Sequence, residues 1–326
     1  MSLATTSANH GERLRSRLRK TAPLLVLVGL CILIGVTSPN FLSLPNGIRV
    51  LTAASIPMVL ALGATFVILV GGIDLSVEGN IALSAIVLSL VLSGPLGTLG
   101  LWAVPLAILA GAAMGAANGA AHVGLRIPSF MVTLGTWFVG LGLGTVLLGG
   151  GTIRIVEPSI RALSLTRFVG LPLLVWIAAA ALLVAWVLQA RTRFGRHVYA
   201  VGGAEDLAAL SGIRVGRIKV LVFILAGAFY GLAAVMSAAQ IGQGNAAVGD
   251  GRLFTTITAV VVGGTSLAGG DGGVIETAIG VLIVAVLANG MILLGIPPYV
   301  QQAVQGLMII AAVAISIDHR LFRIVK

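Results

Sequence analysis

The 326 residues are 58% hydrophobic and only 9% charged, with a mean hydropathy of +1.10 and a formal net charge of +10. Because ordinary soluble domains carry charge on roughly a quarter of their residues, this composition excludes a soluble globular protein and indicates an integral membrane protein. In such a protein the excess of positive charge reflects membrane orientation and lipid contact, and it does not indicate a nucleic acid partner.

Apolar runs long enough to cross a bilayer recur along the whole chain. A crossing helix needs about 20 apolar residues, which predicts about ten spans, with about nine or eleven left open. The predicted spans are residues 22–37, 50–70, 78–93, 100–121, 127–148, 170–189, 218–240, 254–268, 274–294 and 298–317. The third and the eighth are short and contain glycine, which favours broken or re-entrant helices. The predicted fold class is all-α, a polytopic membrane protein.

Lys and Arg are distributed unevenly among the connecting segments. If the N-terminus is cytoplasmic, 15 of the 20 Lys and Arg residues fall in inside segments and 5 fall outside. Because positive charge concentrates in short cytoplasmic loops, the pattern predicts that both termini and a central polar loop are cytoplasmic. The predicted parts are a basic N-terminus (1–21), a first membrane half of about six spans (22–189), the central loop (190–217), a second half of about four spans (218–317) and a basic tail (318–326).

A weak internal repeat connects the two predicted halves. Asn118-Gly119 precedes Ile127–Phe130, and Asn289-Gly290 precedes Ile296–Tyr299. In the predicted topology these two hairpins face opposite sides of the membrane, as an inverted repeat requires. We therefore expect the two halves to be related as inverted repeats.

The longest polar interruption, Gln189–Lys219, carries six Lys and Arg residues. Within it, Ala204–Ser211 is predicted to form a short helix, because acids stand at its start, where the helix dipole favours them, and glycine follows its end. The residues that mark this helix are Glu205 and Asp206 at the start, Leu207 and Leu210 on one face, and Gly212 after the end. A short helix within a basic loop indicates docking of a soluble partner, and a solvated loop without a partner is the alternative.

The chain lacks the residues that would bind ATP or catalyse a reaction. A Walker A loop ends in Gly-Lys-Ser/Thr, but none of the three lysines, Lys20, Lys219 and Lys326, follows a glycine. The histidines are too dispersed for a metal site, and no Ser/His or paired Asp group typical of an intramembrane protease is evident. Energy for transport must come from another subunit, or the protein is a passive pore.

Four motifs occur in a characteristic order along nearly the whole chain. They are VILVGGIDLSV at Val67–Val77, IPSFMVTLG at Ile127–Gly135, TRFGRHVYAVGG at Thr192–Gly203 with LSGI at Leu210–Ile213, and AVVVGGTSLAGG at Ala259–Gly270. In these motifs the chain resembles the ribose-type permeases, which are the membrane subunits of bacterial ABC importers for monosaccharides.

The resemblance implies a multi-pass permease of the bacterial inner membrane that pairs with a second copy of itself or with a paralogue. Two cytosolic ATPase subunits, or one double-domain ATPase, would grip the central loop and bind ATP-Mg, so this chain itself needs no cofactor. An extracytoplasmic sugar-binding protein would dock on the other side. The residues expected to couple to the ATPase are Arg193, Phe194, Gly195, Gly202, Gly203, Glu205, Asp206, Leu207, Leu210 and Gly212.

The chain departs from this family pattern at several positions. They are Glu78, inserted before Gly79; Ala204, in place of Asn; Leu253 and Thr255, where an acid is often found; and Glu276, in place of Gly. The added and lost carboxylates leave the exact solute open. We predict import of a pentose, hexose or related polyol; a nucleoside or another small polar solute is the alternative substrate, and a passive channel or facilitator is the alternative class.

Polar side chains at membrane depth are costly and are therefore candidates for a translocation pathway or gate. These candidates are Asp74, Glu78, Asn80, Asn118, Thr133, Gln240 and Asn289. The predicted topology places Asp74, Glu78 and Glu276 near the cytoplasmic edge, where capping of a helix start by Asp74 and solvation of both glutamates are the alternative roles.

The longest predicted outside loop is Gly149–Gly170. Its charged residues are Arg154, Glu157, Arg161 and Arg167. We predict that this loop helps to receive the binding protein, with its charges setting the association rate. A solvated loop without this role is the alternative.

Overall fold

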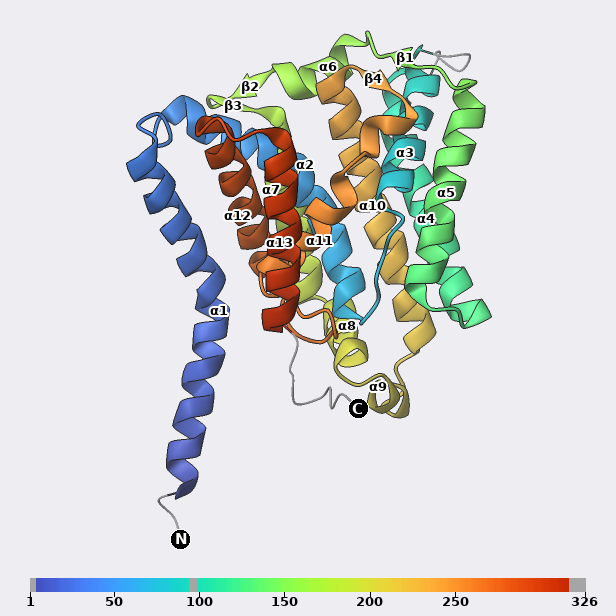
Figure 1. Ribbon diagram of the computed structural model, residues 1–326. Coiled ribbons are helices and arrows are strands. Elements are labelled where there is room, and N and C mark those ends of the chain that lie inside the picture. Colours follow the sequence, from blue (N-terminus) through green and yellow to red (C-terminus); the bar gives the residue numbers. More distant parts are fainter. Residues whose placement is uncertain (1–3, 94–98, 317–326) are drawn as a thin grey trace.

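The computed structural model describes residues 4–93 and 99–316 and is a bundle of helices (Figure 1). The α-helices are α1 (Ala4–Thr37), α2 (Leu44–Leu69), α3 (Val77–Ser93), α4 (Ala103–Leu125), α5 (Ser129–Leu148), α6 (Pro158–Leu165), α7 (Leu173–Arg191), α8 (Arg193–Gly203), α9 (Glu205–Leu210), α10 (Val215–Ile241), α11 (Arg252–Val262), α12 (Val274–Leu293) and α13 (Pro298–Ser316). Two 3₁₀ helices, η1 (Gly100–Trp102) and η2 (Ala246–Gly249), complete the helical elements.

Four two-residue strands lie at the upper end of the bundle in Figure 1. They are β1 (Ile153–Arg154), β2 (Arg167–Phe168), β3 (Leu171–Pro172) and β4 (Gln243–Gly244). β1 pairs antiparallel with β4, and β2 pairs antiparallel with β3. The β1–β4 pair joins the long connection that follows α5 to the connection that follows α10.

Every predicted span contains a helix. Six helical segments among the described residues are long and apolar enough to cross a membrane, namely α2, η1 with α4, α5, α7, α10 and α12. The apolar part of α1, Thr21–Thr37, and α3 are apolar but shorter. The predicted class, an all-α polytopic membrane protein, is confirmed.

The two spans predicted to be broken are half-helices. α3 has 17 residues and α11 has 11. Gly71–Ser76, which we call the linker, returns from the lower end of α2 to mid-height, where α3 begins and runs upward (Figure 1). From the upper end of α10 the chain descends before α11 begins and continues downward. Gly71 and Gly251 both have φ of +75°, a conformation open to glycine, and they stand where α2 has ended and where α11 is about to begin.

Two series of helices follow one another in the same order but in opposite directions. α2, α3, α4 and α5 form the first, and α10, α11, α12 and α13 form the second (Figure 1). The α4–α5 turn lies at the lower end and the α12–α13 turn at the upper end, on opposite sides as expected from the repeat. By direction, α1 and α7 lead the two series. The helix directions therefore favour five helices in each series, and the division after residue 189 stays a prediction.

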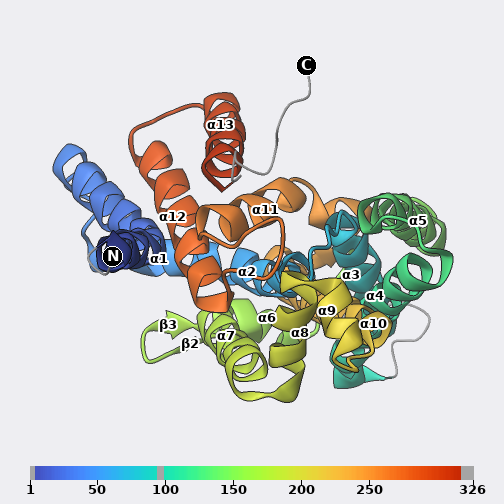
Figure 2. The ribbon, with the colours of Figure 1, turned by 90° about the horizontal axis from the view of Figure 1, so that it is seen from below.

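α2 and α10 form the centre of the bundle. Seen from below, α2 lies between α11 and α7, which both pack against it (Figure 2). α10 packs most extensively against α4. Gly111, Gly115 and Gly119 recur every fourth residue on the α4 face of this contact, and a Cβ on Gly119 would lie only 2.8 Å from Val220 Cα. Small residues at this spacing let membrane helices approach until their backbones touch.

Candidate functional site

The linker is held in place by two hydroxyl groups at the start of α5. Its backbone has no neighbouring strand, so its N–H groups need side-chain acceptors. The Ile73 amide donates to Ser129 Oγ at 3.0 Å, and the Leu75 amide donates to Thr133 Oγ1 at 2.9 Å. Side chains of α5 therefore accept the hydrogen bonds of two linker amides, those of Ile73 and Leu75.

Asp74 lies at the end of a chain of buried hydrogen bonds. Its Oδ1 accepts from the Ser76 amide at 2.8 Å and from Ser76 Oγ at 2.6 Å. Asn118 Nδ2 donates to Ser76 Oγ at 2.9 Å, and Thr136 Oγ1 donates to Asn118 Oδ1 at 2.6 Å. Every donation runs towards the carboxylate, which in its ionised form only accepts. This network ties the linker to α4 and α5.

Glu78 joins the two half-helices. It is in the first turn of α3, and its Oε1 accepts from the Leu253 amide, in the first turn of α11, at 3.0 Å. A carboxylate at a helix N-terminus satisfies one of the free N–H groups there and is favoured by the helix dipole. Half-helices that meet at mid-membrane are typical of transporter binding sites. Glu78 therefore stabilises the junction between the two halves of the chain.

We expect Glu78→Leu to loosen this junction and Glu78→Gln to preserve it. The glutamine carbonyl can still accept from Leu253, whereas leucine leaves a buried N–H unsatisfied at a cost of about 1–3 kcal/mol. Thermal unfolding of the purified chain should show a clear loss of stability for the leucine variant and a small one for the glutamine variant. Equal loss for both variants would mean that the charge, and not the hydrogen bond, stabilises the junction.

The depth of Asp74 and Glu78 corrects the sequence-based expectation. Both were placed near the cytoplasmic edge, but they lie at mid-height and are only 6% and 7% exposed. The expectation failed because it let the third span start directly after Gly72, whereas the linker first climbs back into the bundle. The Asp74 carboxylate accepts from the backbone amide of Ser76, the residue directly before α3. Glu276, in the first turn of α12, lies towards the lower end as expected.

The remaining pathway candidates do not gather around the linker. Asn80 Nδ2 donates to the Gly111 carbonyl of α4 at 3.1 Å. Gln240 is exposed at the upper end of α10. Asn289 and Asn46 exchange two amide hydrogen bonds of 2.9 and 3.0 Å between α12 and α2. The structure therefore groups Asp74, Asn118 and Thr133, brings Glu78 to α11, and separates the others.

Several residues of this site were missed from the sequence. Ser76 was part of the motif Val67–Val77 but was not selected as a site residue, because only the ionisable Asp74 stood out in it. Ser129, Thr133 and Thr136 recur at i, i+4 and i+7, so they share one face of α5. That spacing is a signal that could have found all three, although only Thr133 was selected.

Three glycine-rich segments meet at the lower end of the bundle. The Gly270 amide donates to the Leu69 carbonyl at the end of α2, at 2.9 Å. A Cβ on Gly202 of α8 would collide with that same carbonyl, and a Cβ on Gly270 would lie 2.8 Å from Gly203 Cα. We call this contact between α2, α8 and the α11–α12 connection the glycine junction. The three backbone segments in this junction approach so closely that no side chain fits between them.

Side chains extend the glycine junction to α7 and α12. Tyr199 Oη of α8 donates to the Gly272 carbonyl at 2.5 Å and accepts a short hydrogen bond from Gln189 Nε2 of α7. Gln189 Oε1 accepts from the Val274 amide at the start of α12, at 2.8 Å. Burial raises the pKa of the Tyr199 hydroxyl, which keeps it a hydrogen-bond donor at neutral pH. α8 therefore contacts α2, α7 and the α11–α12 connection.

The central polar loop contains two helices instead of the one predicted. α9 (Glu205–Leu210) confirms the predicted helix within Ala204–Ser211, and Leu207 and Leu210 are 64% and 85% exposed. α8 was not predicted. Its Val198 and Val201 are buried, and Phe194 packs against Phe66 with ring centroids 6.0 Å apart. α8 thus anchors the loop on the bundle, while α9 presents two exposed leucines at its lower tip.

The other proposed coupling residues either pack α8 against the bundle or are exposed to a partner. Gly195 is buried where a Cβ would collide with the Gln189 carbonyl, so it belongs to the packing of α8. Arg193 and Asp206 are exposed. Gly212 has φ of +82° and lets the chain turn from α9 towards α10.

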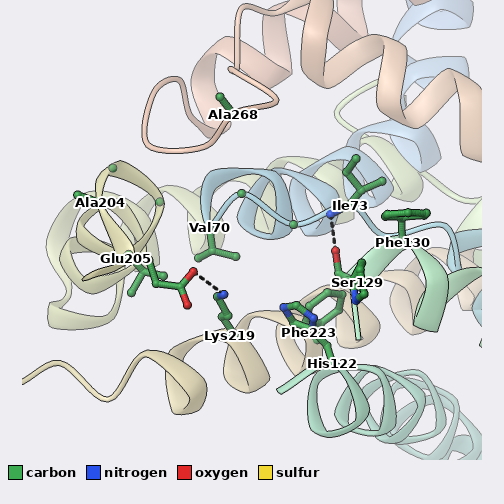
Figure 3. Close-up of a pocket in the computed structure, with 16 residues that line it drawn as sticks. Val70, Ile73, His122, Ser129, Phe130, Ala204, Glu205, Lys219, Phe223 and Ala268 are labelled. Carbon is green, nitrogen blue, oxygen red and sulfur yellow. Dashed lines mark hydrogen bonds and ion pairs between the residues drawn. The ribbon is translucent and has the colours of Figure 1, made fainter. Parts of the chain in front are cut away.

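A chamber of about 430 Å³ lies between the linker and the α8–α9 turn (Figure 3). Ser129, His122 and Phe223 point into the same region, and the Ile73–Ser129 hydrogen bond forms part of its wall. Glu205 and Lys219 face each other at one side, with Oε2 and Nζ 2.6 Å apart. The chamber therefore borders both the linker and the polar loop.

At the upper end, the side chain of Arg161 ties the outside loop to α10. Arg161 Nη1 donates to the Ala239 carbonyl at 2.5 Å and to the Gln240 carbonyl at 3.3 Å, so it caps the last turn of α10. Arg154 and Arg167 are exposed, and Glu157 is partly exposed. Arg154 and Arg167 thus present positive charge on this face. Within the described ranges, no group of three His, Cys, Asp or Glu side chains could hold a metal ion.

Residues 46–313 match the family model described as branched-chain amino acid transport system / permease component. The chain is 35% identical over 318 residues to the ribose import permease protein of Escherichia coli (strain K12), covering 96% of this chain and 98% of that protein. It is 37% identical over 302 residues to the ribose import permease protein of Bacillus subtilis (strain 168), covering 92% and 93%.

A relative with a different named sugar is similar over the same extent. The galactose/methyl galactoside import permease protein of Haemophilus influenzae is 33% identical over 310 residues, covering 90% of this chain and 91% of that protein. No solved structure gives a significant match.

Proposed function

The chain belongs to the family of branched-chain amino acid transport system permease components, and from that membership we propose that it forms the pathway of an ATP-driven importer for a monosaccharide. The observation that carries the proposal is similarity along nearly the full length to permeases named for ribose and galactose import. The protein is a transport subunit and not an enzyme, and ATP is used by a separate ATPase in such systems.

The proposed partners follow from the two ends of the bundle. At the lower end, two ATPase subunits, or one double-domain ATPase, would bind α9 through Leu207 and Leu210. At the upper end, an extracytoplasmic binding protein would deliver the sugar. A second permease, identical or paralogous, would complete the complex in the bacterial inner membrane, with both termini in the cytoplasm.

The glycine junction supports a mechanical role for the polar loop. Closely packed backbones transmit displacement because they have no space in which to relax. A push on α9 would pass through α8 to the end of α2 and to the α11–α12 connection. The end of α2 leads through the linker to α3, and the α11–α12 connection leads back to α11; α3 and α11 meet at Glu78. We infer that ATP-driven movement of α9 alternately opens the pathway to the two sides of the membrane.

The proposal is tested by solute uptake into proteoliposomes that contain this chain, its ATPase and its binding protein. We expect uptake of radiolabelled ribose, galactose or allose to require ATP inside and binding protein outside. Uptake that continues without ATP would contradict the proposal and indicate a passive pore. Uptake of nucleosides that sugars do not inhibit would support the proposed importer but would show that its substrate is a nucleoside.

Charge on the upper loop is expected to steer the binding protein. We predict that Arg154→Glu with Arg167→Glu slows association by about tenfold at low ionic strength, because charged rims act mainly on the association rate. The difference should shrink in high salt. Arg217→Glu at the opposite end of the molecule is the control. Unchanged association kinetics in the double variant would show that the loop is only solvated.

A further inference from the structure

The chamber beside α9 has the size of a small-molecule site. Its volume of about 430 Å³ is within the roughly 300–1,000 Å³ of typical ligand pockets. Its walls are supplied by the linker, the lower parts of α4 and α5, the α8–α9 turn and the first turns of α10 (Figure 3). It therefore lies between the linker and the polar loop, towards the lower end of the bundle.

The lining offers uncharged polar groups beside aromatic surface. His122 Nδ1 lies 2.7 Å from the Ile127 carbonyl, a contact that needs a hydrogen on Nδ1, so Nε2 is the ring nitrogen left for a ligand. Ser129 contributes a hydroxyl and Phe130 an exposed ring face. A neutral ring that carries several hydroxyl groups matches such a surface, because it needs both hydrogen bonds and apolar contact.

One ion pair crosses the side of the chamber. Glu205 is the first residue of α9, and Lys219 belongs to the second turn of α10. The Lys219 side chain is only 16% exposed, so its charge depends on Glu205 for compensation. Gly212 follows α9 with φ of +82°, and no other residue is packed where its Cβ would stand. A displacement of α9 away from α10 would have to break this ion pair.

We propose that the chamber is the exit site of the translocation pathway for a neutral sugar, and that the Glu205–Lys219 ion pair is the latch through which α9 closes it. The proposal extends the function proposed above and rests on it. With the pair intact, α9 stays against α10 and the exit is narrow. When α9 is displaced, the pair separates and the exit widens.

The exit is tested by thiol accessibility in the complete complex. The single cysteine is first removed by Cys31→Ala, and Ser129→Cys then reports on the chamber. Ala190→Cys, exposed at the lower end of α7, is the matched control. In lipid nanodiscs, we expect saturating ribose, galactose or allose to slow modification of Ser129→Cys by a membrane-impermeant thiol reagent, and to leave Ala190→Cys unchanged. Modification that none of the sugars slows would overturn the exit site.

The latch is tested by neutralising and then reversing the ion pair. In the nucleotide-free complex, Lys219→Met should raise the rate of modification at Ser129→Cys by about fivefold or more, the usual scale of a coupling between sites. Glu205→Lys combined with Lys219→Glu should restore the original rate. A rate unaffected by Lys219→Met, or one that the reversed pair does not restore, would overturn the latch.

This test is distinct from the test of import. If sugars protect the chamber and the reversed pair restores closure, but uptake proceeds without ATP, the import mechanism is wrong and the exit site stands. If uptake requires ATP but the chamber shows neither effect, the importer stands and its exit lies elsewhere.

Discussion

Replacing Leu207 and Leu210 of α9 by aspartate is expected to abolish ATP-driven uptake. Both side chains are exposed on the lower tip of the molecule, so the substitutions leave the packing of the bundle intact. At an interface, loss of an anchoring side chain costs about 2 kcal/mol or more, which is about 30-fold in affinity. We expect co-purification of the ATPase with this chain to fall by at least that factor, and uptake to fall with it.

Leu125→Asp provides a matched control for the α9 variants. Leu125 ends α4 at the same end of the molecule and is also exposed, but it is outside α9. The control variant should retain its ATPase and its uptake. Full ATPase binding by the α9 double variant would place the docking surface elsewhere, whereas loss in both variants would point to a general effect of added acidic charge.

Gly115→Ala should destabilise the protein strongly, although the same change usually stabilises a helix. A Cβ at position 115 would lie 2.9 Å from the carbonyl carbon of Phe223 and would also collide with its oxygen. α4 and α10 would have to separate, and overpacking of this kind costs about 1–3 kcal/mol. Thermal unfolding of the full chain in detergent should show a clearly lower midpoint.

Gly124→Ala separates packing from helix propensity. Gly124 is in the same helix, but no other residue lies within 4 Å of the position its Cβ would take. Alanine is favoured over glycine in a helix by about 0.5–1 kcal/mol, so this variant should be as stable as the wild type or slightly more stable. A lower midpoint for both variants would mean that glycine at these positions serves the backbone and not the α4–α10 contact.

The sequence predicts the membrane helices well because hydrophobic length is a local property. α5 was expected at residues 127–148 and runs from Ser129 to Leu148, and α12 was expected at 274–294 and runs from Val274 to Leu293. The shortness of the third and eighth spans was indicated by Gly79 in α3 and by Gly263 and Gly264, which follow α11. A broken helix can be predicted from glycines within one segment. Hairpins on opposite sides can be predicted from two segments with matching sequences.

The course of the linker could not be predicted in the same way. Hydropathy does not distinguish a short apolar segment that leaves the membrane from one that turns back into it. The linker depends on Ser129 and Thr133, hydroxyl groups that are more than 50 residues further along the chain. Only the folded chain brings these partners together. The sequence-based expectation for the depth of Asp74 and Glu78 was therefore wrong.

α8 was missed for a different reason. Its sequence is rich in basic and small residues, so the segment resembles a solvated loop. Phe194, Val198 and Val201 nevertheless recur at i, i+4 and i+7, the spacing of one apolar helix face. A search for amphipathic periodicity in the polar segment would have found this helix, whereas average hydropathy conceals it.

α10 is attached to both faces of the molecule. It has 27 residues, which at about 1.5 Å per residue gives a rod of about 40 Å. Arg161 of the upper loop holds one end, and Glu205 of α9 holds the other. If events at the two ends are coupled through α10, the coupling is reciprocal. If docking of the binding protein strengthens ATP binding by some factor, ATP must strengthen docking by the same factor.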